Sequence, residues 1–393
     1  MRIKHLKNAQ VDSFQDGDWI ESPFITDKGI RYLTTGNVGD GFFKRQGNGF
    51  ISEETFVNLN CKYAYPGDLV ISRLNEPYGR ACILPNDEER YVLAVDIVIL
   101  RTDNDKRYLC YLMQCNGYQN AVQDAAKGTT MKRISRNNLG NVVLPMAPLP
   151  EQKIIADYLD DKCNRIDIII SEAKATIEEY KAWKASIIYE AVTKGLDKNV
   201  EMKDSGVEWI GVAPSKWSCP ALKNICSMQS GKSLTSEQIS DSGLYPVYGG
   251  NGIRGYYDLY NTEGEFLTVG RQGALCGNVH KVSGKVWATE HAVVTIPKAN
   301  VDLLYLYYNL IAMNLNQYAS NTAAQPGLAV GVILQKHTTM PSLEEQKAIG
   351  LYLDEKCRQI DSLISEKKSL ISDLESYKKS LIFETVTGKR KVV

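Results

Sequence analysis

A long internal repeat constrains the fold of this chain more than any other feature. Residues 151–193 and 345–387 align without a gap at an offset of 194 positions, and about half of the aligned residues are identical. Apolar residues recur at intervals of three, four or seven, and Gly350 is the only glycine or proline in either copy. This spacing keeps apolar side chains on one face of a helix, so it predicts one long helix per copy. A helix of about 43 residues is about 65 Å long, several times the average length.

The apolar face of each predicted helix is too long to remain in water, so each helix needs a partner. Because the two faces match in length and phase, we predict that the copies pair with each other as an antiparallel coiled coil with a pseudo-twofold axis. Separate surface helices and a dimerising coiled coil are the alternatives. The positions expected at the helix–helix contact are Ile155, Leu159, Ile166, Ile170, Ile177, Ile187, Ile349, Leu353, Ile360, Ile364, Ile371 and Leu381.

The two predicted helices alternate with two globular segments. We expect a first domain at residues 1–150, a helix at 151–195, a second domain at 196–340 and a second helix at 341–393. Both globular segments contain short apolar runs broken by Gly, Pro and Asn, which is typical of strands, and the predicted class is α+β. The predicted strands are 68–73, 91–100, 266–270 and 292–296, and the predicted shorter helices are 106–123 and 302–314. The domains are much less alike than the helices, as expected of one scaffold that carries two different binding domains.

Composition limits the class of protein. The chain carries 46 Lys and Arg and 46 Asp and Glu, whereas a nucleic-acid-binding protein usually has a basic excess. Any affinity for DNA is therefore expected from local basic patches or from a basic partner. The nine cysteines include no Cys-x-x-Cys pair, which favours reduced thiols in the cytoplasm over disulfides or a zinc site. Neither a membrane span nor a signal peptide is expected, because no apolar run is long enough.

Several short motifs accompany this layout. A Leu-Pro-Glu-Gln run at 149–152 enters the first helix, and residues 343–346 enter the second. The second domain contains distinctive runs at 204–211, 213–217, 245–252 and 270–279. With the alternation of domain and helix, these motifs resemble the specificity-subunit family of type I restriction–modification systems. The resemblance covers essentially the whole chain, although nothing before residue 31 matches the Val-Glu-Trp-Ile-Gly run of 207–211.

The resemblance implies a role in reading double-stranded DNA. Each domain would recognise one half of a bipartite site, and the helices would set the spacer between the halves. Two methyltransferase subunits and the restriction–translocation subunits would be the protein partners, with no membrane involved. S-adenosylmethionine would bind the methyltransferase, which would methylate adenine after base flipping. No cofactor, metal or catalytic residue is expected in this chain. The alternatives are a specificity subunit of a type II-like enzyme and a coiled-coil scaffold without a DNA role.

The second domain contains polar side chains suited to reading base edges. Residues 250–255 match the G-x-G-x-x-G pattern, but the tyrosine-rich segment that follows is no helix start, so a dinucleotide site is not expected. A turn that carries Asn and Arg towards DNA is favoured, with a plain surface hairpin as the alternative. The candidate DNA-binding residues of this domain are Lys232, Tyr248, Asn251, Arg254, Tyr256, Arg271, Gln272, His291 and Gln325.

The first domain has two polar segments of similar character. One follows the predicted strand at 68–73, and the other is a dense basic run before Pro145. Arg, Lys, Asn, Thr and Tyr suit both phosphate contacts and base readout, although either segment is also consistent with a solvated loop. The candidates are Arg73, Asn75, Tyr78 and Arg80 in the first segment and Lys127, Thr129, Thr130, Lys132 and Arg133 in the second.

Overall fold

The computed structural model describes residues 2–6, 11–47, 49–126, 133–273, 275–320 and 327–392. It divides into two compact units, Met1–Ala173 with Ser369–Val393, and Lys174–Lys368. Each unit contains one globular domain and a part of both long helices, α5 (Leu149–Lys194) and α8 (Leu343–Val386). The division therefore falls inside the helices, whereas the sequence placed the boundaries at the helix ends. Both helices form as predicted, with α5 starting two residues earlier than 151 and α8 ending at Val386.

The domain of the first unit is built on two small sheets. The antiparallel sheet has the order β2-β8-β5-β6, from β2 (Val11–Asp16), β8 (Ile97–Thr102), β5 (Leu69–Ser72) and β6 (Ala81–Ile83). The second sheet has the order β4-β3-β7, and its strands β3 (Ile30–Leu33) and β7 (Tyr91–Leu93) run parallel, while β4 is Phe50–Ile51. A separate pair joins β1 (Arg2–His5) to β9 (Val143–Met146). The helices are α1 (Glu53–Asn58), α2 (Lys106–Met113), α3 (Asn116–Ala126) and α4 (Arg136–Gly140).

Two predicted elements of this domain are interrupted. The strand expected at 91–100 is split into β7 and β8, because a turn closed by the Ile97 N–H and the Ala94 carbonyl sends the two halves to different sheets. The helix expected at 106–123 is split into α2 and α3 at Gln114 and Cys115. Side-chain pattern alone does not show such turns, since the apolar residues on both sides are buried.

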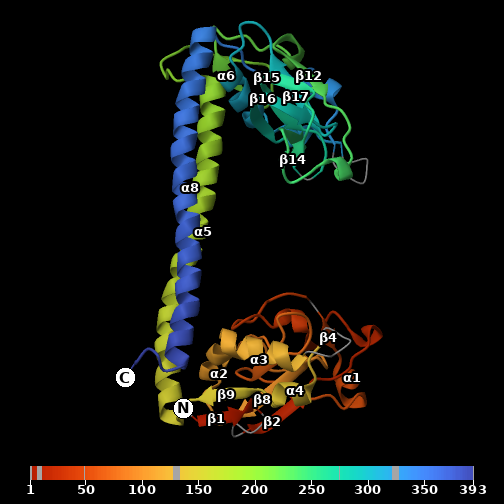
Figure 1. Cartoon of the computed structure of the whole chain (residues 1–393), viewed down its shortest axis with the longest axis vertical. Helices are drawn as coiled ribbons and strands as arrows, with labels where there is room; N and C mark the ends of the chain where they lie inside the picture. Colours follow the sequence, from red (N-terminus) through yellow and green to blue (C-terminus); the bar gives the residue numbers. More distant parts are fainter. Residues whose placement is uncertain are drawn as a thin grey trace. The chain divides into compact units, whose positions relative to one another are not determined.

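The domain of the second unit contains one six-stranded sheet with the order β12-β17-β15-β16-β13-β14. Its strands are β12 (Cys226–Ser230), β13 (Tyr245–Gly249), β14 (Gly252–Tyr257), β15 (Thr262–Gly270), β16 (Val279–Ala288) and β17 (Ala292–Pro297). A short hairpin of β10 (Met202–Asp204) and β11 (Val212–Pro214) precedes them. Helix α6 (Leu303–Ala312) lies beside β15, β16 and β17, and α7 is Val330–Leu334 (Figure 1).

The two domains share one topology despite their different sequences. The order β2-β8-β5-β6 corresponds to β12-β17-β15-β16, and the parallel pair β3/β7 corresponds to β13/β16. The long strand β16 therefore occupies the positions that β6 and β7 share in the first domain. The two divergent globular segments are therefore two versions of one fold.

Each domain is fixed to the start of its following long helix by a buried glutamine. In the first unit, Gln152 Oε1 accepts a hydrogen bond from the Asp105 N–H at 3.0 Å, and Gln152 Nε2 donates to the Ala147 carbonyl at 2.8 Å. In the second unit, Gln346 Oε1 accepts from the Asp302 N–H at 2.8 Å, and Nε2 donates to the Pro341 carbonyl at 3.0 Å. Both glutamines occupy the same repeat position. The repeat therefore includes the junction between domain and helix.

The long helices are also joined by a repeated ion pair. Lys378 contacts Asp167 at 2.6 Å in the first unit, and Lys184 contacts Asp361 at 2.7 Å in the second. Asp167 and Asp361 share one repeat position, and the two lysines share another. Of the residues expected at the helix–helix contact, Ile187 and Ile371 are half-buried. The buried ones are Ile155, Leu159, Ile166, Ile170, Ile177, Ile349, Leu353, Ile360, Ile364 and Leu381. No helix in the described part of the chain has both the length and the apolar character required to span a membrane.

Candidate nucleic-acid interface

The candidate site of the second domain lies at the tip of the β13–β14 hairpin. Gly249 pairs with Gly252, so residues 250 and 251 make a two-residue turn. Gly252 has a φ of 93°, which favours glycine, and Gly250 lies so close to β15 that a Cβ on Gly270 would be 2.0 Å from the Gly250 carbonyl oxygen. The glycines of the G-x-G-x-x-G pattern therefore allow a tight turn and close backbone packing. After the pattern β14 ends at Tyr257 and a loop follows, so no helix starts there, in agreement with the sequence argument against a dinucleotide site.

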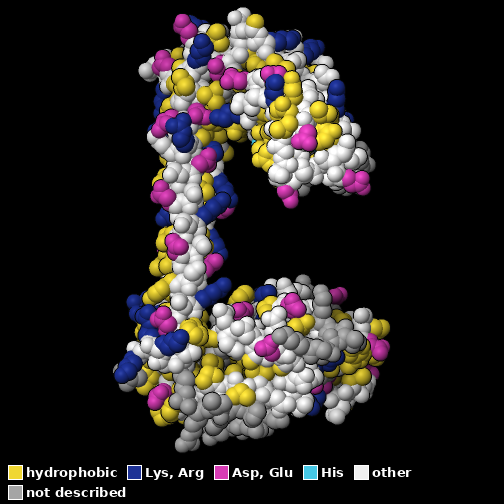
Figure 2. Space-filling model, in the orientation of Figure 1, with side chains coloured by type: hydrophobic (Ala, Val, Ile, Leu, Met, Phe, Trp, Pro, Cys, Tyr) yellow, Lys and Arg dark blue, Asp and Glu magenta, His cyan; other side chains and the backbone are white. Residues whose placement is uncertain are grey.

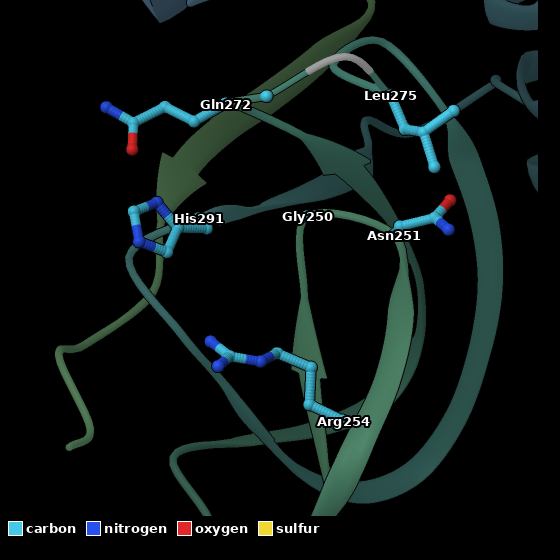
Figure 3. A pocket seen from close by; sticks show the side chains of 7 residues that line it. Gly250, Asn251, Arg254, Gln272, Leu275 and His291 are labelled. Atoms are coloured by element: carbon cyan, nitrogen blue, oxygen red, sulfur yellow. The ribbon is translucent and has the colours of Figure 1, made fainter. Parts of the chain in front are cut away.

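Four polar side chains from three segments line a hollow of about 370 Å³ at this tip. Asn251 and Arg254 come from the hairpin, Gln272 follows β15, and His291 precedes β17. In Figure 3, Arg254, Gln272 and His291 lie on one side of the tip, and Asn251 lies on the other. Arg can bond bidentately to guanine, and Asn or Gln to adenine, so the set is suited to reading base edges. The structure thus brings together four of the candidates that the sequence predicted.

Neighbouring groups hold the rim of the hollow in place. Asn278 Nδ2 donates a hydrogen bond to Asn251 Oδ1 at 2.7 Å, and Arg271 Nη1 donates to Ser230 Oγ at 3.3 Å. His291 Nε2 is 3.4 Å from Glu290 Oε1, a contact that becomes an ion pair when the imidazole is protonated. Arg254, Gln272 and Asn251 remain exposed, so their polar groups are accessible to a ligand.

A second histidine lies behind the turn rather than in the hollow. A Cβ on Gly252 would be 3.5 Å from the His280 imidazole. Burial lowers the pKa of His280, which keeps the ring neutral at pH 7. His280 therefore supports the turn and adds no positive charge.

The other second-domain candidates surround the hollow to different degrees. Lys232 is exposed, and its backbone carbonyl accepts a hydrogen bond from Trp287 Nε1 at 3.1 Å. Tyr248 and Tyr256 are half-buried, and burial raises the pKa of Tyr248. Lys232 is thus suited to a phosphate contact, while the tyrosines contribute mainly to the hairpin.

In the first domain, the structure separates the candidates into buried and exposed residues. Arg73 is only 3% exposed and lies between Asp16 at 3.1 Å and Asp96 at 3.6 Å. Tyr78 is buried as well, whereas Asn75 is exposed and Arg80 is half-exposed. The sequence interpretation placed Arg73 and Tyr78 in a polar DNA-facing loop. Their burial removes them from the contact surface, because β5 ends at Ser72 and the next side chain is held inside by two carboxylates.

The basic run of the first domain is described only at its end. Arg133 forms an ion pair with Asp96 at 2.7 Å and is half-exposed. The remaining candidates of this run, together with one candidate of the second domain, lie outside the described residues; they are Lys127, Thr129, Thr130, Lys132 and Gln325.

Positive charge is local rather than general over the visible surface. Figure 2 shows Lys and Arg mixed with Asp and Glu along the long helices and over the second domain. This agrees with the equal numbers of basic and acidic residues in the chain. Among the described residues, no group of three or more His, Cys, Asp or Glu side chains could hold a metal ion.

Comparison with known proteins adds to this geometry. A family model described as the type I restriction modification DNA specificity domain matches residues 9–179 and again residues 214–372. The two matches together cover most of the chain. The chain belongs to this DNA specificity family. Each match includes one globular domain and part of the long helix after it, so the family unit agrees with the repeat.

Named relatives of this specificity family member match it over different lengths. The EcoprrI specificity subunit of Escherichia coli is 45% identical over 138 residues, and this match spans 34% of each chain. The MjaVIII specificity subunit of Methanocaldococcus jannaschii is 25% identical over 302 residues, or 70% of this chain and 68% of that subunit. The chain thus matches only about a third of the length of the EcoprrI subunit.

Solved structures of low sequence identity share the fold. A chain from a study of complex assembly and conformational transition of the type I R-M system superposes with a TM-score of 0.72 at 14% identity. That superposition covers 98% of this chain and 97% of that one. The HsdS subunit from Thermoanaerobacter tengcongensis has a TM-score of 0.54 at 14% identity, with 99% and 97% covered. The mixed α and β fold of this specificity chain is therefore that of known specificity subunits.

Proposed function

We propose that this chain is the non-catalytic DNA specificity subunit of a type I restriction–modification complex. Each globular domain reads one half of a bipartite site in double-stranded DNA. The observation that carries the proposal is the repetition of one domain topology on one helix–domain junction, with different exposed side chains in each copy. A scaffold without a DNA role does not require a hollow lined by Asn251, Arg254, Gln272 and His291.

The decisive experiment exchanges one domain. Residues 1–150 are replaced by the corresponding domain of another family member, and the hybrid is expressed with the methyltransferase subunit that serves this chain. Mapping of methylated bases should show one half of the site changed and the other half unchanged. A hybrid that changes both halves would contradict one domain per half-site.

The two long helices pair antiparallel along their length and set the spacer. The reciprocal ion pairs Asp167–Lys378 and Lys184–Asp361 support this arrangement, because an exchange of the helices maps one pair onto the other. To test this role, one helical turn, about 5.4 Å, is added to each long helix, near Ala173 in α5 and opposite it in α8. The half-sites should stay the same while the spacer lengthens, and an unchanged spacer would contradict the role of the helices.

Membership of the specificity family supports a proposal for the protein partners. Two methyltransferase subunits bind, one for each helix–domain unit, and the restriction–translocation subunits join them. S-adenosylmethionine binds the methyltransferase rather than this chain. The complex acts in the cytoplasm, a proposal that rests on the scattered spacing of the nine cysteines in the sequence.

A further inference from the structure

The two domains contain an equivalent eight-residue loop that a comparison at the repeat offset does not align. Residues 73–80 follow β5, and residues 271–278 follow β15. Matching backbone hydrogen bonds close both loops. The Gly79 N–H bonds to the Ser72 carbonyl and the Gly277 N–H to the Gly270 carbonyl, each at 2.8 Å. The strand before each loop also donates to the loop's eighth residue, Arg80 or Asn278.

The first residue of each loop is an arginine in the same backbone environment. The Arg73 N–H bonds to the Asp96 carbonyl at 2.8 Å, and the Arg271 N–H bonds to the His291 carbonyl at 2.9 Å. Their carbonyls accept from Ile134 and Leu328, respectively. The side chains contact equivalent residues too, since Arg73 pairs with Asp16 and Arg271 bonds to Ser230. The equivalence therefore rests on backbone and side-chain contacts together.

The eighth residue connects each loop to the segment that follows an equivalent strand, β3 in the first domain and β13 in the second. Arg80 Nε donates to the Val38 carbonyl at 3.2 Å in the connection between β3 and β4. Asn278 Nδ2 donates to Asn251 in the turn between β13 and β14. The loop of the first domain thus has the same neighbour as the loop that lines the hollow of the second domain.

Both loops have an exposed fifth residue followed by a buried sixth residue. In the first loop Asn75, Glu76 and Pro77 are exposed and Tyr78 is buried. In the second, Gln272 and Leu275 are exposed and Cys276 is buried. The fifth residue is Pro77 in the first loop and Leu275 in the second, and Asn278 at the end of the second loop is exposed as well. The exposed middle of loop 73–80 is therefore accessible to a ligand, while the backbone hydrogen bonds at its ends hold the loop in place.

We propose that the exposed middle of loop 73–80 reads the first half-site, with Glu76 as the base-contacting residue. The inference rests on the proposed function and extends it to the first domain, where the sequence singled out Arg73, Asn75, Tyr78 and Arg80 but not Glu76. Arg73 is a positioning residue, because its side chain is buried between two carboxylates.

The chemistry of Glu76 restricts what it reads. A carboxylate is repelled by phosphates, so its favourable contacts with DNA are with hydrogen-bond donors on base edges. In the major groove it accepts a hydrogen bond from an exocyclic amino group, as in contacts between Glu and cytosine N4. The loop holds Glu76 in place, since Tyr78 donates to its carboxylate at 3.5 Å and Arg80 to its carbonyl at 3.2 Å. The first half-site should therefore contain a cytosine that this carboxylate contacts.

The test uses the full-length chain in complex with its methyltransferase subunit. Methylated sites are mapped for the wild type, Glu76→Gln and Gln272→Ala. Glu76→Gln should relax one position of one half-site, and Gln272→Ala should alter only the other half-site. In competition between duplexes that differ at the relaxed base pair, the wild type should prefer its own site by about tenfold, and Glu76→Gln by less than about twofold.

A matched control separates base reading from a general change of charge. Glu89 is exposed in the same domain, and Glu89→Gln makes the same charge change, so it should leave both half-sites unaltered. A split site that is identical in the wild type and Glu76→Gln would overturn the assignment of this loop, as would a change of both halves. A wild type that methylates no split site would instead overturn the proposed function, and this inference with it.

Discussion

Arg73 in the first domain and Arg271 in the second occupy the same place after equivalent strands, but their surroundings differ. Arg73 is held by Asp16 and Asp96, whereas the corresponding positions in the second domain are Ser230 and His291. Burial lowers the pKa of Arg73, while both carboxylates oppose that effect. Arg271 is half-exposed, and the next residue, Gln272, lines the hollow. One loop geometry thus holds a buried arginine side chain in the first domain and a half-exposed one in the second.

The largest expected effect tests this contrast directly. Arg73→Ala removes the buried cation between Asp16 and Asp96, which keep only their contacts with the more exposed Arg136 and Arg133. It also takes a hydrogen-bond donor from the Ile134 and Val95 carbonyls, so it should destabilise the first unit by about 3 kcal/mol. Arg271→Ala removes one hydrogen bond to a serine and should cost the second unit about 1 kcal/mol or less. Because the chain has two units, hydrogen exchange of peptides from β5 and β15 is the suitable measurement. Equal losses in both units would show that the two arginines are equally structural.

The second-largest expected effect concerns the junction between domain and helix, which is alike in the two units. Gln152→Ala and Gln346→Ala each leave a partly buried N–H and a buried carbonyl without their side-chain partner, so each should cost about 2 kcal/mol in its own unit. The exposed Gln359 is the control, and Gln359→Ala should change stability by about 0.5 kcal/mol or less. The N-terminal turns of α2 and α6 report the effect by hydrogen exchange. A large loss at only one of the two junctions would contradict their equivalence.

A smaller effect concerns DNA recognition by the open hollow. Arg254→Ala should weaken binding of the cognate duplex about tenfold, and Arg254→Lys should restore little of it if the guanidinium bonds bidentately. Arg165 is equally charged and 69% exposed on α5, so Arg165→Ala serves as the control. Binding to duplexes with either half-site replaced measures the effect. The prediction fails when Arg254→Ala and Arg165→Ala weaken binding alike.

The smallest effect is a pH dependence confined to the second domain. Burial lowers the pKa of His280, so stability from the neutral ring is complete above the unfolded value near 6.5 and is lost as the pH falls below it. The equivalent position in the first domain is Cys82, where burial raises the pKa to about 12 and keeps the thiol neutral throughout. Hydrogen exchange should therefore show weaker protection of β16 at pH 5.5 than at pH 7.5 in the wild type. The same loosening in His280→Gln would assign it to another group.

The long helices were the most predictable part of the molecule, because their apolar period extends over many turns. The partner of each long helix and the topology of the domains were harder to predict from the sequence. The splits at Ala94 and at Gln114 depend on turns between buried segments, which the pattern of apolar residues does not mark. The candidates Asn251, Arg254, Gln272 and His291 were found from residue type, and the structure places them around one hollow.

Glu76 and the burial of Arg73 could not be predicted from the sequence. The equivalent loops lie 198 positions apart, whereas the repeat helices lie 194 apart, so a comparison at the helix offset misaligns them. The available signal was short: both segments begin with arginine and carry glycine at the seventh position. Only the matching hydrogen bonds make that signal meaningful.

The most direct test of the account is a map of methylated bases in cells that express the wild-type chain with its methyltransferase subunit. The account predicts one split motif with two fixed halves and a constant gap, and methylated adenine in each half. Methylation of a single continuous motif, or of no defined motif while the complex still forms, would contradict the reading of one half-site by each domain.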